Sequence, residues 1–302
     1  MFNAAADEQT SVADHLQDLL SDHSHDIRTG AKALLGLAAQ VNTTDDAARF
    51  ASVVSHVVGE ESGNWDLARN LINSLEARFR QSVGVQGNLA VACYLSSHWV
   101  AGLEAESRAM AAARESALSV CVWVRLSAAH AFQGQQDWQS CFALLGPVLD
   151  LAQGVQAGSR HDSAIASIAN NLATDLLDFE QRTAPHDDAL ERATLLSHRF
   201  WESAGSWIHH ERAEYLLALT YNALHRFDEA RRAATRALAI IDSHGDEPVD
   251  RAFINLELAL ACRELKRTED FERARKNASD IAGTFEDPGL QQWFQSKYAR
   301  VA

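Results

Sequence analysis

The chain has 302 residues, of which 47% are hydrophobic, and its formal net charge is −14. Such a hydrophobic fraction excludes an intrinsically disordered chain, and the acidic balance argues against direct binding of nucleic acid, whose phosphates repel it. Apolar runs span only a few residues, far short of the roughly 20 that cross a bilayer, and residues 1–7 lack the pattern of a signal peptide. We therefore expect a globular, cytoplasmic protein that makes no membrane contact.

The composition favours helix almost throughout, because the chain holds only 4 prolines and 15 glycines. No stretch alternates apolar and polar residues, so no strand is expected. Residues 1–60 predict three helices, near 12–20, 26–41 and 45–58. The last has acidic residues in its first turn, which favours a helix N-terminus. We interpret residues 1–60 as an N-terminal helical cap, since the terminal units of a helical array are atypical.

A short sequence pattern recurs further along the chain: a polar turn leads to an aromatic residue, and a small residue follows three positions later. It occurs as Gly63-Asn64-Trp65, Gln136-Asp137-Trp138 and His225-Arg226-Phe227. A recurring unit of this length indicates stacked helix pairs. The small residues that we take as markers of successive units are Ala68, Ala105, Cys141, Ala189 and Ala230.

Each unit is expected to hold two helices whose apolar residues recur at three- and four-residue steps. The first helices are expected over 87–100, 119–133, 162–182, 211–224 and 249–265. The second helices are expected over 65–80, 102–116, 138–153, 186–202 and 227–242. Glycines and prolines predict breaks at 84–87, 134, 154–158, 185, 245–248 and 288, with a longer turn at 183–187. A final helix over 293–302 is expected to cap the last pair with Trp293, Phe294 and Tyr298.

These residues resemble the tetratricopeptide repeat family. In the segment 211–241, Leu217-Ala218 and Tyr221 stand where that family places a large-small pair and an aromatic, and Phe227, Ala230 and Ala237 stand at its turn aromatic and two small positions. The segment 122–151 matches next best, with Ala128-Ala129, Phe132, Trp138 and Cys141. The resemblance covers about residues 45–285. The sequence departs from the family in three ways. The glycine of the family's first helix is replaced by Cys93, Ala129, Ala173 and Ala218. The proline that usually closes a unit is missing, and the units are longer.

The resemblance implies an all-α fold, a right-handed α-solenoid of antiparallel helix pairs with about five to six units. Its divisions would be the cap at 1–60, the repeats at 61–285 and a C-terminal capping helix at 286–302. In that family the first helices line a concave groove. By position, the residues of the groove here would be Tyr94, His98, Trp123, His130, Gln133, Asn170, Thr174, Arg212, Tyr215, Asn222 and Arg263. Amides pair with a peptide main chain, aromatics supply contact area, and arginines hold a carboxylate.

Catalytic and metal-binding signals are weak. The cysteines Cys93, Cys121, Cys141 and Cys262 form no CxxC pair and lack zinc-ligand spacing, so we expect reduced, buried thiols. A cluster of His15, Asp22, His23, His25 and Asp26 is interpreted as solvated surface, and His209-His210-Glu211 lacks the spacing of two ligands on one helix face. No HExxH, phosphate loop, nucleophile elbow or dinucleotide fingerprint occurs. We expect no catalytic residue, cofactor or metal.

The leading hypothesis is a non-catalytic scaffold or adaptor that binds a protein or peptide in the groove. A regulatory sensor module for a signalling peptide or small ligand, as in looser arrays of bacterial regulators, is the alternative, and a metal-dependent hydrolase is the third. The basic stripe of Arg226, Arg231, Arg232 and Arg236 is interpreted as an ordinary solvated helix face. Trp201 and Trp207 are candidates for a homo-oligomer surface, with packing between units as the alternative.

Overall fold

The structure is a computed structural model that describes residues 12, 16, 27–113 and 116–301. The described residues form 14 α-helices and one π-helical segment, and they contain no strand. The prediction of an all-helical protein built from consecutive helix pairs is confirmed. The chain divides into two compact units, residues 1–155 and 156–302.

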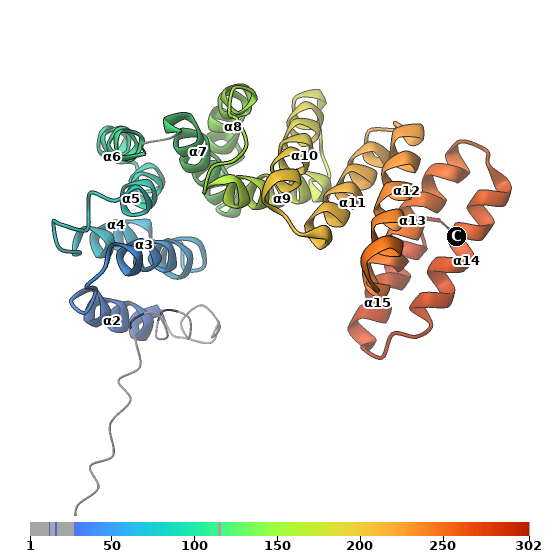
Figure 1. The fold of residues 1–302 in the computed structure, drawn as a ribbon, viewed down its shortest axis with the longest axis horizontal. Coiled ribbons are helices and arrows are strands. Elements are labelled where there is room, and N and C mark those ends of the chain that lie inside the picture. Colours follow the sequence, from blue (N-terminus) through green and yellow to red (C-terminus); the bar gives the residue numbers. More distant parts are fainter. Residues whose placement is uncertain (1–11, 13–15, 17–26, 114–115, 302) are drawn as a thin grey trace, which may run out of the picture. The chain divides into compact units, whose positions relative to one another are not determined.

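The first unit runs from α2 to α8 (Figure 1). Within it, α5 packs against α6 and α7 against α8, while α4 packs against α5 and the π-helical segment η1, which continues α3. The bounds are α2 (Ile27–Ala38), α3 (Thr44–Val53), η1 (Val54–Glu60), α4 (Trp65–Asn73), α5 (Val83–Leu95), α6 (Trp99–Ala112), α7 (Ala117–Gly134) and α8 (Trp138–Gln153). The helix expected over 12–20 lies almost wholly outside the described residues.

The second unit runs from α9 to α15 (Figure 1). Its pairs are α9 with α10, α11 with α12 and α13 with α14, and α15 packs against α13. The bounds are α9 (Asp162–Asp178), α10 (Ala184–Ala204), α11 (Trp207–Ala223), α12 (Phe227–His244), α13 (Pro248–Glu264), α14 (Thr268–Ala282) and α15 (Pro288–Tyr298). The first helices also contact one another, α9 with α11 and α11 with α13.

Four of the turns inside pairs share one backbone conformation. In each, the second residue beyond the first helix has a φ between 57° and 63°, and these residues are Ser97, Gln136, His225 and Lys266. The Gln136 N–H bonds to the Gln133 carbonyl at 2.8 Å, and the Asp137 N–H bonds to the Phe132 carbonyl at 2.9 Å, with equivalent bonds in the other three turns. This is the Schellman motif, which satisfies the last carbonyls of a helix while reversing the chain. The recurring sequence pattern therefore marks a turn of one particular backbone conformation.

The small residue after each turn is a packing position. Ala68, Cys141 and Ala230 are completely buried. In α6, however, this position belongs to Gly102, three residues after Trp99, and the choice of Ala105 as the marker was wrong. A Cβ atom on Gly102 would lie 2.6 Å from the Tyr94 ring, so only glycine allows this approach of α6 to α5.

Several predicted boundaries are also wrong. The break expected at 84–87 lies inside α5, because Gly84 and Gly87 allow close packing against other helices. A Cβ atom on Gly84 would lie 2.8 Å from the Cβ of Ala48, and one on Gly87 would lie 2.1 Å from the Trp123 ring. The helix expected over 65–80 ends at Asn73, and the one expected over 162–182 ends at Asp178. The longer turn therefore spans 179–183, and α14 has no counterpart among the predicted helices.

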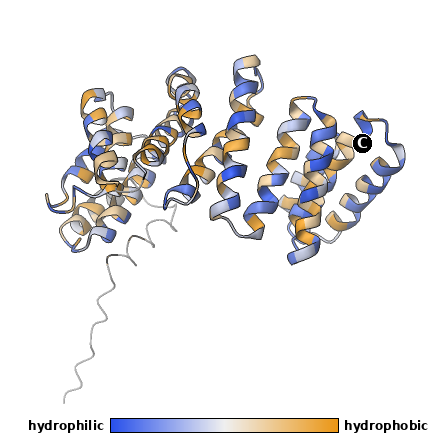
Figure 2. Ribbon diagram, turned by 45° about the horizontal axis from the view of Figure 1, so that its top comes forward, coloured by the Kyte–Doolittle hydropathy of each residue, from blue (hydrophilic) through white to orange (hydrophobic). Residues whose placement is uncertain are grey.

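The C-terminal helix begins at Pro288, earlier than expected, and proline suits the first helical position because its missing N–H would have no partner there. Phe294 is buried, and its ring meets that of Phe253 at 5.6 Å between centroids. Trp293 also lies on Phe253, at 4.2 Å, but keeps half of its surface exposed. In Figure 2 the helices of both units carry both apolar and polar residues, which lie on different sides of α12 and α14 but are mixed around α5 and α11. Among the described helices, none is both long and apolar enough to cross a membrane.

Candidate functional site

The first unit contains a buried carboxylate, Glu106 of α6, that sequence reasoning did not single out. Its side chain accepts hydrogen bonds from the Tyr94 hydroxyl, from Arg125 Nε at 2.8 Å and from the Cys121 thiol at 3.1 Å. Glu106 is 2% exposed, so its charge is neutralised mainly by Arg125. A buried carboxylate that is fully hydrogen-bonded and paired is a stable structural group.

The surroundings of Glu106 make its neighbours unreactive. Burial, together with the hydrogen bond to Glu106, raises the pKa of the Cys121 thiol to about 12. The same two causes raise the pKa of Tyr94, which is itself buried. Cys121 is therefore a protonated thiol at neutral pH and no nucleophile. Tyr94, expected to line the groove, instead belongs to the interior between α5 and α6.

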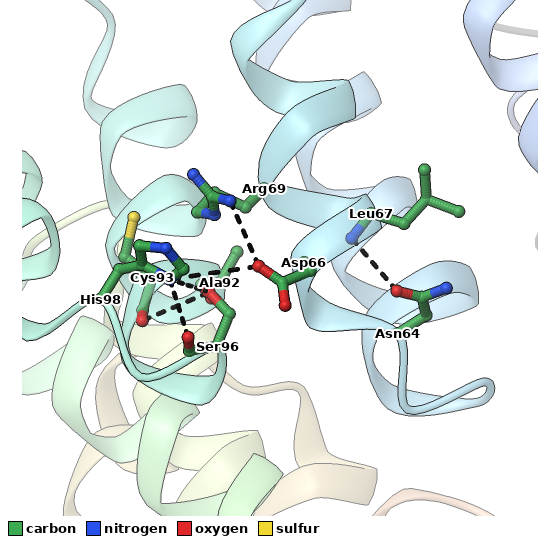
Figure 3. A network of polar contacts seen from close by, with 8 residues as sticks. All are labelled: Asn64, Asp66, Leu67, Arg69, Ala92, Cys93, Ser96 and His98. Atoms are coloured by element: carbon green, nitrogen blue, oxygen red, sulfur yellow. Dashed lines mark hydrogen bonds and ion pairs between the residues drawn. The ribbon is translucent and has the colours of Figure 1, made fainter.

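The other groove residues expected in the first unit lie on α7 and at the turn before α6. Trp123 is half-buried and lies against Gly87 of α5. His130 and Gln133 are half-buried on the same helix. His98 is exposed. Its Nδ1 lies 2.7 Å from the Ser96 carbonyl oxygen and 4.0 Å from Asp66 of α4, and both contacts can be followed in Figure 3.

The Asp66 carboxylate in that network also accepts a hydrogen bond from Arg69 at 3.2 Å (Figure 3). Its place at the start of α4 is favourable, because the N-terminus of a helix attracts negative charge. Asn64 caps the same helix by accepting the Leu67 N–H at 3.2 Å. We infer that these polar contacts hold the N-terminus of α4 against the turn between α5 and α6.

In the second unit, the expected groove residues of α9 point to solvent at least in part. Asn170 is half-buried, and its Nδ2 reaches the Asn171 side chain only at 3.4 Å. Thr174 is exposed and donates its hydroxyl to the Asn170 carbonyl at 3.0 Å. The Asn170 side-chain oxygen, Oδ1, accepts no hydrogen bond from the described part of the chain.

The seam between α11 and α13 is polar. Arg212 is exposed and donates to the Asp250 carboxylate at 2.9 Å. Its neighbour Glu211 is completely buried, and neither of its carboxylate oxygens has a donor within the described residues. Burial, with the nearby Asp250 charge adding to it, raises the pKa of Glu211 to about 8. Glu211 is therefore largely protonated at neutral pH and can share its proton with Asp250.

Tyr215 and Asn222 lie one and three turns further along α11. Asn222 is buried and donates to the Glu257 carboxylate at 2.7 Å. The Tyr215 ring packs into the apolar clusters on both sides of α13, but its hydroxyl makes no hydrogen bond within the described residues. Burial raises the pKa of Tyr215, and the Glu257 and Asp250 charges act in the same direction. The hydroxyl is therefore a protonated, unused donor in acidic surroundings.

The last expected groove residue, Arg263, is half-buried and is already engaged. It donates to the Arg300 carbonyl at 2.8 Å and to the Glu264 carboxylate at 3.1 Å. Arg300 in turn reaches Glu257 at 3.5 Å. Arg212 and Arg263 both have acceptors within the chain, so an incoming carboxylate would compete with these acceptors for their guanidinium groups.

Another buried carboxylate, Glu214, joins α10, α11 and α12. Arg236 binds it through two hydrogen bonds of 2.8 and 2.7 Å, and His198 lies 3.2 Å away. The hydrogen bond to Glu214 raises the pKa of His198, while these two partners outweigh burial and lower the pKa of Glu214. Arg236, which we interpreted as part of a solvated stripe, therefore neutralises a buried acid.

The remaining candidates are placed as follows. Trp201 and Trp207 are half-buried, and their rings lie against His209 and His244 at 4.2 and 5.7 Å. The N-terminal histidine cluster lies outside the described residues. Within the described ranges, no three His, Cys, Asp or Glu side chains gather in a way that could hold a metal ion.

The candidate site consists of Asn170 and Thr174 of α9 and Arg212 and Tyr215 of α11, two first helices in contact with each other, and we call this set the α9–α11 face. Comparison with known proteins adds no family to this description. Scanned against models of protein families, the sequence matches none, and a search of curated proteins finds no significant match.

Proposed function

We propose that the protein binds an extended peptide or protein segment on the α9–α11 face, as a non-catalytic scaffold or adaptor. The helix pairs support reading the chain as a tetratricopeptide-like array, in which the first helices carry the ligand. Contacts between α9 and α11 bring these two first helices side by side. The proposal therefore keeps the binding surface within a single compact unit.

The observation that carries the proposal is the Tyr215 hydroxyl. Buried and half-buried tyrosines usually place their hydroxyl against a partner, yet this one makes no hydrogen bond within the described chain. Its ring is held by packing on both sides, so the donor is fixed in position. A rigid aromatic with a free polar end binds a ligand at a low cost in side-chain entropy.

The charges around Tyr215 favour a basic ligand. The Glu257 and Asp250 carboxylates act on its hydroxyl, the charge of Arg300 opposes them, and Arg212 already pairs with Asp250. A lysine or arginine of the ligand would be attracted to these two carboxylates, whereas a carboxylate of the ligand would be repelled by them. Asn170 offers a side-chain oxygen that can accept a main-chain N–H of the same segment.

A displayed peptide library selected on the full chain tests this proposal. We expect enriched peptides to carry a lysine or arginine and to bind less tightly to Tyr215→Phe and Asn170→Ala. Tyr215→Phe keeps the packed ring and removes only the hydroxyl. The control is Lys276→Ala, an exposed residue of α14 that pairs with Asp280. Peptides that bind the Asn170→Ala, Arg212→Ala, Tyr215→Phe triple variant as tightly as the native protein would refute the assignment.

A further inference from the structure

A cavity of about 370 Å³ lies among α12, α13 and α14, lined from these helices and the α13–α14 turn. No residue of α9 or α11 lines it, so it is separate from the α9–α11 face. Three arginines line it, Arg231, Arg267 and Arg273, against a single acidic lining residue, Asp270. In a chain of net charge −14, this local excess of cations requires an explanation.

The internal ion pairs leave donor capacity in the cavity. Asp270 accepts hydrogen bonds from both Arg267, at 2.7 Å, and Arg273, so one carboxylate is shared between two guanidinium groups. Arg231 donates to Asp228 at 3.2 Å, while its Nε is buried and has no partner among the residues that the structure describes. Each guanidinium offers five N–H donors, more than these carboxylates can accept.

The three arginines share the lining of the cavity with the Cys262 thiol, which is 1% exposed. Burial, with the Asp270 charge adding to it, raises the pKa of Cys262, while the charges of Arg267, Arg231 and Arg273 oppose this rise. All three cations are therefore close to the same buried group. The rest of the lining includes Leu238 and Leu258, which are apolar, and Asn277, whose exposed amide has no partner in the described chain.

We propose that this cavity binds the phosphate group of a small phosphate monoester. A phosphate presents three acceptor oxygens, which suit several converging guanidinium forks better than the two oxygens of a carboxylate do. The volume exceeds the size of a bare phosphate, and Leu238 and Leu258 can contact an apolar substituent. Binding here is independent of peptide binding on the α9–α11 face.

Isothermal titration calorimetry with phenyl phosphate tests the proposal, and benzoate of the same ring size tests the preference for phosphate. We expect phenyl phosphate to bind the native chain and to bind it more tightly than benzoate. Arg231→Ala should weaken binding by about 10- to 100-fold, since a charged hydrogen-bond partner is lost. Asp270→Asn should strengthen binding, because it removes the competing carboxylate. Arg275→Ala, which breaks a pair with Glu272 on α14 outside the lining, should leave binding unchanged.

Melting temperatures in chloride buffer show whether each variant is folded. Arg231→Lys provides a second variant, which keeps the positive charge but loses the planar guanidinium group. This variant should bind with intermediate affinity. The absence of phenyl phosphate binding by the native chain would overturn the proposal. So would equal binding of benzoate, weaker binding by Asp270→Asn, or a loss in Arg275→Ala as large as in Arg231→Ala.

Discussion

The protonation of Glu211 makes a measurable contribution to stability, and its direction follows from the contacts around it. The carboxyl is completely buried at the start of α11, lies near Asp250 and near Glu247, the residue that precedes α13, and has Arg212 as its one nearby cation among the described residues. Its pKa is raised from 4.5 to about 8 in the folded chain. Folding therefore favours the protonated form.

The Glu211 carboxyl makes the folded chain less stable as the pH rises. Below pH 4.5 the carboxyl is protonated in both states, and above about pH 8 it is ionised in both. Between these values the unfolded chain binds fewer protons than the folded chain, so the free energy of unfolding falls as the pH rises. At about 1.4 kcal/mol for each unit of pKa, the full loss is up to roughly 5 kcal/mol.

The variant Glu211→Gln isolates this contribution. Glutamine keeps a donor for Asp250, as the protonated acid does, but it cannot ionise. We expect the variant and the native chain to have similar stability near pH 5, and the variant to be more stable by roughly 3–5 kcal/mol above pH 8. Urea unfolding at several pH values measures the difference, and contributions from His198 and Glu257 cancel because both chains contain them. Glu269→Gln, an exposed residue of α14, controls for net charge. Parallel stability curves for the native chain and Glu211→Gln would refute the reasoning.

Three further predictions concern the packing of Trp65, the backbone of the turns and the buried carboxylate of Glu214. Trp65→Ala should cost about 3–5 kcal/mol in urea unfolding, because the ring is 2% exposed and fills the space over Gly59; a loss below 1 kcal/mol would contradict its packing role. Gln136→Gly should stabilise the chain by about 1 kcal/mol, since its φ of 62° strains any side chain; destabilisation would contradict the turn geometry. Glu214→Gln should lower the pKa of His198 in an NMR titration, because the hydrogen bond that raises it is weakened; an unchanged titration would argue against their contact.

The helix pairs could be predicted from the sequence because their signals are local. The Schellman turn involves only the end of one helix and the start of the next, so Gln136-Asp137-Trp138 carries it in adjacent residues. The turn at Ser97-His98-Trp99 was missed because the small residue that follows it is glycine, which in a sequence usually indicates the end of a helix. Helix α14 was missed because its buried residues are three alanines on an otherwise charged helix.

Glycines that serve close packing could not be recognised from local patterns. Gly84 and Gly87 predict a break when only neighbouring residues are considered. Their actual role depends on Ala48 and Trp123, which belong to other helices. Such contacts become visible only when the helices are placed in three dimensions.

The buried carboxylates were missed for the same reason. Glu106 and Glu214 look like ordinary charged positions of a helix, and their partners Arg125 and Arg236 belong to the next helix along the chain. One signal was present: Glu214 follows Ala213 and precedes Tyr215, Leu216 and Leu217, so an acid there lies on a helix that is apolar on most sides. A charge on such a helix has to be buried and paired.

Photo-cross-linking of an enriched basic peptide to the full chain tests the central claim most directly. The claim is that the segment binds on the first helices of the second unit. Mass spectrometry of the cross-linked chain should place the attachment points on α9 and α11, around Asn170, Thr174 and Arg212, with fewer cross-links in Tyr215→Phe. Cross-links confined to α12 and α14, or the same cross-links in Tyr215→Phe as in the native chain, would contradict the account.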